Sequence, residues 1–155
     1  MVEPSSDRRA VFRGVVSLAL HDGNLSFGEK RLITKLAMAL RLDDDEPKMI
    51  YDAILEEVKL EDGHPLTISE KFTAYEQVLE TFLINTNKTD DELRMIAYLR
   101  RVFEISDSEH RAILSSLDRQ LEDIVHRNVK QSIRFELKEI NKRLSEILES
   151  VRIQR

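Results

Sequence analysis

The sequence of 155 residues contains no cysteine and no tryptophan, and it has only 4 glycines and 3 prolines. Without cysteine the chain can form neither disulfide bonds nor thiolate metal ligands, and it has no thiol nucleophile. Because glycine and proline mark tight turns and interrupt helices, their scarcity disfavours a fold of many short strands. The composition therefore favours an all-α fold, and the length suffices for one domain with a sizeable core.

Long apolar runs are also missing, and so are the local motifs of common enzymes. No stretch could span a membrane and the first residues lack the apolar segment of a signal peptide, so we expect a soluble cytoplasmic protein. Peripheral membrane association stays open but is not indicated, and the net charge of −5 argues against nucleic-acid binding. No glycine-rich phosphate loop, Gly-x-Ser-x-Gly or His-Glu-x-x-His occurs, so we expect no enzymatic activity. Carboxylates that meet across two helices are the enzymatic alternative that the sequence leaves open.

Two amphipathic helices joined by a short polar turn are predicted within residues 12–42. The turn at residues 22–24 reads Asp-Gly-Asn, in which glycine tolerates positive φ and the polar side chains can bond to nearby backbone. Ser26 and Glu29 then match a capping box, in which each side chain bonds to the other residue's amide. The apolar residues recur at helical spacing on both sides of the turn: Phe12, Val15, Val16, Ala19 and Leu20 before it, and Leu32, Ile33, Leu36, Ala37 and Leu40 after it.

The same unit returns 63 positions later without a gap. Ser26 then aligns with Thr89, and Glu29 aligns with Glu92. Further matches fall in the turn and the core: Leu20 with Leu83, Asn24 with Asn87, Ile33 with Ile96, and Leu36 with Leu99. Two copies are too few for a solenoid. We therefore predict two pseudo-repeated three-helix units, at about residues 6–59 and 67–117, packed as one globule.

Further capping boxes open at Thr67 and Ser106 and predict two more helix starts. The helices expected in the first unit cover about residues 7–21, 27–41 and 46–59. The acidic run at residues 43–46 is predicted to cap the third of these helices, with a calcium or magnesium site as the alternative. Val58, near the end of that helix, is expected to face the core.

A long helical extension is predicted for residues 118–155, because neither glycine nor proline occurs between His110 and Val151. Basic residues outnumber acidic ones from Arg127 onward, whereas the rest of the chain is acidic. The apolar residues of this tail form an a/d seam of a coiled coil: Ile133, Leu137, Ile140, Leu144, Ile147 and Val151. We expect the seam to bind a second copy or a protein partner. Two alternatives stay open: the tail folds back on its own domain, or it binds a membrane surface or nucleic acid.

The first turn also resembles part of a calcium loop. If Asp22 occupies loop position five, Glu29 falls at position twelve, as an EF-hand requires. Positions one and three would then be Leu18 and Leu20, which carry no ligand oxygen, so an ordinary EF-hand is excluded. A partial site for Ca²⁺, Mg²⁺ or Zn²⁺ could use His21, Asp22 and Glu29. The alternative is that these residues only form a capped turn.

Residues 18–30, with Leu32-Ile33 and Leu36-Ala37 behind them, resemble the tellurite-resistance TerB-like domain. That family shows an apolar helix, an Ala-Asp-Gly turn, an Ile/Leu-Ser step, a glutamate pair and an amphipathic helix. Here His21 replaces the usual small residue, and Gly28 replaces one of the acidic pair. The second unit also lacks the Asp-Gly turn.

The resemblance covers about residues 12–117 and implies an all-helical fold of two such units. TerB-like domains are generally regarded as non-enzymatic, cytoplasmic or membrane-associated modules of stress and metal-ion response, with proposed metal binding. Only Asp22 and Glu29 carry over as candidate metal ligands. The leading hypothesis is therefore a non-enzymatic protein-interaction module or scaffold, and the alternative is a divalent-ion sensor centred on the first turn.

Overall fold

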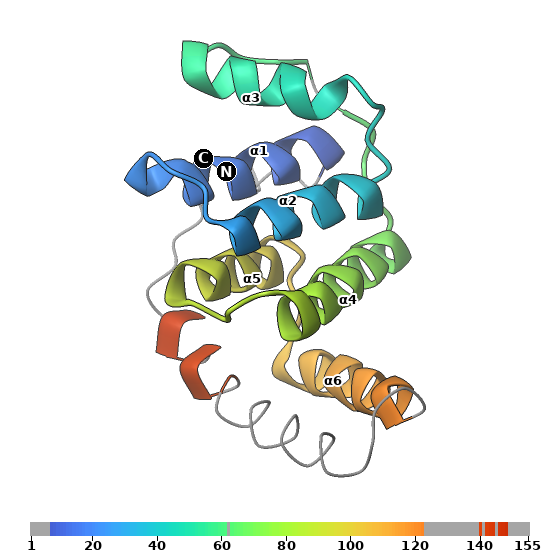
Figure 1. Cartoon of the computed structure of the whole chain (residues 1–155). Helices are drawn as coiled ribbons and strands as arrows, with labels where there is room; N and C mark the ends of the chain where they lie inside the picture. Colours follow the sequence, from blue (N-terminus) through green and yellow to red (C-terminus); the bar gives the residue numbers. More distant parts are fainter. Residues whose placement is uncertain (1–6, 62, 123–139, 141, 145, 149–155) are drawn as a thin grey trace.

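The computed structural model describes residues 7–61, 63–122, 140, 142–144 and 146–148 (Figure 1). Within these residues the prediction of an all-α fold is confirmed. The elements are α1 (Arg8–Ala19), the 3₁₀ helix η1 (Leu20–Asp22), α2 (Phe27–Ala39), α3 (Glu46–Glu56), α4 (Ile68–Asn85), α5 (Asp90–Val102) and α6 (Asp107–Glu122).

Four capping boxes open helices where the sequence predicts them. In α2 and α5 the capping residues are Ser26 and Thr89, and in α4 the capping residue is Thr67. At the start of α6, Ser106 and Glu109 bond reciprocally, with N···O distances of 2.9 and 3.1 Å. These contacts are local, because each box joins residues only three positions apart, and this locality is why the sequence pattern predicts them.

Two helix ends differ from the prediction. Helices α2 and α3 end at Ala39 and Glu56, two or three residues earlier than expected. The chain leaves the helical path because Arg41 and Glu57 both adopt a left-handed conformation with φ of 56°. Val58 consequently points outward and is 44% exposed, so the prediction that it faces the core is wrong.

Local geometry recurs 63 positions apart at the ends of α2 and α5. Arg41 and Glu104 have nearly equal positive φ values of 56° and 55°. The residue after each donates its amide to a carbonyl five positions earlier, as in a Schellman motif: Leu42 to Ala37 at 3.1 Å, and Ile105 to Arg100 at 3.0 Å.

The helices stack in layers, and α5 lies in the middle of the stack. Figure 1 shows α3 over α1 and α2, which lie over α5 and α4, with α6 below them. Helix α1 packs on α3, α2 and α5, while α2 runs beside α4. Helix α5 is buried on nearly all sides, and its buried residues are Glu92, Leu93, Met95, Ile96, Ala97, Tyr98, Leu99, Arg100 and Val102.

The C-terminal segment returns to this core. Residues 140, 142–144 and 146–148 are helical, and they lie near the start of α5 (Figure 1). Ile140 and Leu144 belong to the same hydrophobic core as the six α-helices, with exposed fractions of 5% and 1%. Helix α6 continues past the predicted boundary at residue 118. The rest of the predicted extension lies outside the described residues.

Gly14 allows α1 to approach α5 closely. A Cβ atom at this position would overlap the hydroxyl oxygen of Tyr98 and would lie 2.6 Å from its Cζ atom. We expect Gly14→Ala to lower the free energy of unfolding by about 2 kcal/mol, because the overlap forces α1 and α5 apart. This outcome opposes helix propensity, which favours alanine over glycine by about 1 kcal/mol.

Urea unfolding of Gly14→Ala, Tyr98→Phe and the double variant measures this effect. Tyr98→Phe removes the nearest atom, so the double variant should recover part of the loss. A Gly14→Ala variant as stable as the original chain would contradict the packing argument.

Candidate functional site

The three predicted metal ligands lie on either side of the turn between η1 and α2. His21 lies exposed in η1, and Asp22 is the last residue of η1. Glu29 is only 3% exposed. One of its carboxylate oxygens accepts the Ser26 amide at 3.0 Å, and its own amide donates to the Ser26 hydroxyl at 3.1 Å. These bonds are those of a capping box, so the capped-turn alternative describes the contacts of Glu29.

Within the described part of the chain, no group of three or more histidine, aspartate or glutamate residues could hold a metal ion. Ion binding by His21, Asp22 and Glu29 stays a prediction.

Glu92 lies 63 positions after Glu29 and is 1% exposed. Its Oε1 accepts the Thr89 amide at 3.2 Å and the Thr89 hydroxyl at 3.0 Å. Its Oε2 is buried, and no described residue gives it a hydrogen bond. That oxygen faces Gly28 in the first turn of α2, where a Cβ atom would overlap it. Gly28 thus leaves the space that the Glu92 carboxylate fills.

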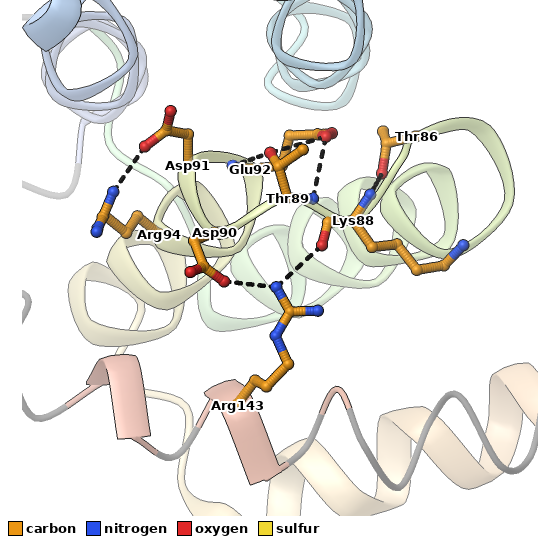
Figure 2. A network of polar contacts seen from close by, with 8 residues as sticks. All are labelled: Thr86, Lys88, Thr89, Asp90, Asp91, Glu92, Arg94 and Arg143. Atoms are coloured by element: carbon orange, nitrogen blue, oxygen red, sulfur yellow. Dashed lines mark hydrogen bonds and ion pairs between the residues drawn. The ribbon is translucent and has the colours of Figure 1, made fainter.

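The connection between α4 and α5 at residues 86–89, here called the second turn, is joined to the C-terminal segment by Arg143. Figure 2 shows the Arg143 side chain extending from that segment to the start of α5. Its guanidinium donates to the Lys88 carbonyl at 3.2 Å and to the Asp90 carboxylate at 2.5 Å. The hydrogen bond and charge of Arg143 hold the pKa of Asp90 below its usual range. Arg101 adds a second attachment, because its Nε donates to the Leu148 carbonyl at 2.9 Å.

The described residues of the predicted seam face their own domain. Ile140 and Leu144 are buried in the core, and Ile147 is partly buried against it. For these residues the fold-back alternative describes the packing. Ile133, Leu137 and Val151 lie outside the described residues, and partner binding through the seam stays a prediction.

A polar cluster around the buried residues Tyr75, Arg100 and His110 links α4, α5 and α6. The Tyr75 hydroxyl lies 2.8 Å from Nδ1 of His110, and both residues are buried. Arg100 donates to the Ile105 carbonyl at 3.1 Å and pairs with Asp107. Burial raises the pKa of Tyr75 well above its usual value, so its hydroxyl stays protonated. Because Tyr75 and His110 lie in the packed core, we interpret the cluster as structural.

The acidic run before α3 differs from the prediction. Asp45 is the N-cap of α3, but its side chain makes no capping bond. The Glu46 carboxylate instead accepts the Asp43 amide at 2.8 Å and pairs with Arg9 at 2.7 Å. The prediction that an aspartate side chain caps this helix is therefore wrong, because the glutamate bonds back to the preceding turn.

A small polar cavity of about 250 Å³ lies beside this run. The residues that line it are Arg8, Arg9, Arg41, Asp43, Glu46, Gly63 and His64. Two of its cations are already neutralised, since Arg9 pairs with Glu46 and Arg8 pairs with Glu70 at 2.5 Å. The hydrogen bond from Arg8 lowers the pKa of Glu70 to about 2. These pairs bind α1 to the starts of α3 and α4, and they leave little net charge for a ligand.

A larger and mostly apolar groove of about 500 Å³ lies between α2 and α4. The residues that line it are Phe27, Lys30, Arg31, Thr34, Lys35, Met38, Thr81 and Asn85. Phe27 and Met38 are 70% and 67% exposed, although both are large apolar side chains. They share one face of α2 with Arg31 and Thr34, because these positions follow the i, i+4, i+7, i+11 spacing.

Arg31 is held in place within this groove. Its guanidinium carbon lies 4.5 Å from the centre of the Phe27 ring, which is a cation–π contact. Its Nη1 also donates to the carbonyl of Asn85, the last residue of α4, at 3.1 Å. Arg31 thus joins the start of α2 to the end of α4, where the helix dipole favours a positive charge.

Sequence reasoning did not predict this groove. The core stripe of α2, which includes Leu32 and Leu36, is evident from its spacing, but a single exposed phenylalanine or methionine is common on any protein. The sequence does contain a second stripe on α2, which includes Phe27 and Met38. This stripe indicates a groove only when α4 is known to lie beside it.

No family model matches the chain, and comparisons with curated proteins and with solved structures likewise found no match. Among the described helices, none combines the length and apolar character needed to cross a membrane.

The Arg143 attachment can be tested through Asp90. We expect Arg143→Ala to raise the pKa of Asp90 toward the usual aspartate value, because the paired cation is removed. Because the pKa of Asp90 is lower in the folded state, the pair stabilises the fold at pH values above the usual aspartate pKa. This contribution to the free energy of unfolding is lost as the pH falls through the lowered pKa.

A carboxyl NMR titration measures this pKa. The matched control is Lys142→Ala, an exposed residue of the same segment. An Asp90 pKa that is unchanged in Arg143→Ala would show that the segment is not held this way.

Proposed function

We propose that this chain is a non-enzymatic helical module that binds a helical segment of another protein in the groove between α2 and α4. The observation that carries the proposal is the exposure of two large apolar side chains, Phe27 and Met38, on the face of α2 that lines the groove beside α4. A surface of this kind is typical of protein-binding sites, and an amphipathic helix placed in an apolar groove is a recurring mode of recognition.

The dimensions of the groove favour a helix over a compact ligand. Phe27 and Met38 stand at the two ends of the apolar face, eleven residues apart on α2. At a rise of 1.5 Å per residue they are about 17 Å apart, which is the length of three helical turns. Burial of one such side chain contributes roughly 2 kcal/mol, so the two together can anchor a partner helix.

We further propose that the chain consists of two pseudo-repeated three-helix units and is TerB-like. The matched capping boxes of α2 and α5 support the repeat, and so do the matched left-handed residues at their ends. The TerB-like assignment, with its context of stress or metal-ion response, rests on the motif of the first turn.

A display library of helical peptides, unbiased in charge, tests the binding function. We expect selected peptides to bind the full chain and to lose at least roughly tenfold in affinity with Met38→Ala, because that side chain is a buried anchor in the complex. The matched control is Leu55→Ala on α3, which truncates a residue of similar exposure (62%) outside the groove. Selected peptides that bind Met38→Ala as tightly as the original chain would contradict the proposal.

Ion sensing is the second hypothesis and has a separate test. If the first turn binds a divalent ion, calorimetric titration of the chelator-treated protein with Ca²⁺, Mg²⁺ or Zn²⁺ should show saturable heat. That heat should be lost in Asp22→Ala, because a ligand oxygen is removed. An affinity that is unchanged in Asp22→Ala would contradict the hypothesis.

A further inference from the structure

We infer that the groove between α2 and α4 selects an acidic amphipathic helix. This inference rests on the proposed function and names the chemistry of the partner. All three charged side chains that line the groove are basic: Lys30, Arg31 and Lys35. The whole chain carries a net charge of −5, so the basic character belongs to this surface and not to the protein in general.

The two lysines flank the apolar face of α2 on opposite edges. With 3.6 residues per turn, Lys30 lies roughly 60° to one side of Phe27 around the helix axis, and Lys35 lies roughly 80° to the other side. The ammonium groups of Lys30 and Lys35 form no ion pair with any described residue. A helix seated on the apolar face would therefore meet a free cation along each edge.

Arg31 has a different role from the lysines. Its stacking on Phe27 and its bond to the Asn85 carbonyl keep the guanidinium within the groove. It forms part of the wall and adds a fixed positive charge at the centre. A partner with leucine-like residues on one face and carboxylates on both flanks matches this arrangement, because opposite potentials across an interface favour the correct partner and speed association.

The C-terminal segment of a second copy is a poorer match, because it is basic and its described apolar residues are already buried against their own core. Self-association through the groove is accordingly an outcome that would overturn the inference.

Fluorescence anisotropy with two designed peptides tests the charge preference on the full chain. Both peptides are helices of about four turns with leucines at i, i+3, i+4 and i+7, and they differ only in whether glutamate or lysine fills the flanking positions. We expect the glutamate peptide to bind at least roughly tenfold more tightly at low salt, and we expect this advantage to shrink as salt is added.

Reversing the charges of Lys30 and Lys35 tests whether the preference for the glutamate peptide arises in the groove. The variant Lys30→Glu/Lys35→Glu should weaken binding of the glutamate peptide by roughly tenfold and improve binding of the lysine peptide. The matched control is Lys59→Glu, an exposed lysine after α3 that does not line the groove. Equal loss in Lys59→Glu would show only a general charge effect and would overturn the inference.

The outcomes separate this inference from the proposed function. If both peptides bind equally and both lose affinity in Met38→Ala, the groove is a binding site but has no acidic preference. If neither peptide binds while peptides from the unbiased library do, the inference fails and the proposed function stands. If the library also yields no binder that depends on Met38, both fail. Dimerisation in sedimentation that Met38→Ala abolishes would assign the groove to a second copy.

Discussion

Helix α5 is buried on nearly all of its sides, and this burial constrains the rest of the molecule. A helix in that position must bury some polar groups, and α5 buries Glu92 near its start and Arg100 near its end. A buried charge is costly unless it is paired or hydrogen-bonded. Glu92 is therefore held by the Thr89 cap, and Arg100 is held by the Ile105 carbonyl and Asp107. The pair with Asp107 also joins α5 to the start of α6, because Asp107 is the first residue of that helix.

The same constraint explains the two faces of α2. One face packs Leu32 and Leu36 into the core next to α5, and the start of α2 must leave room for Glu92 at Gly28. The opposite face carries Phe27 and Met38 toward solvent beside α4. Because its core face is packed and its start is capped, α2 has a fixed place beside α4. For the binding that we propose, a preformed groove lowers the conformational entropy that this chain itself loses.

The sequence predicts local features of this fold well and tertiary features less well. Helix starts are evident because a capping box needs only residues three positions apart, as at Ser26 and Thr67. The ends of α2 and α3 are not evident, because the left-handed residues that follow them, Arg41 and Glu57, are not glycines. The groove needs α4 beside α2, and the attachment of Arg143 needs residues 55 and 53 positions apart. No local pattern encodes such distant contacts.

The attachment by Arg143 has a consequence for the order in which the chain assembles. A capping box closes a loop of three residues, whereas the bond from Arg143 to Lys88 closes a loop of 55. Loop closure costs more entropy as the loop lengthens, and long-range contacts are rewarded only after the local ones exist. The second turn and α5 should thus be complete before the C-terminal segment docks. Release of that segment leaves the start of α5 with its three acidic residues, Asp90, Asp91 and Glu92, but without the arginine.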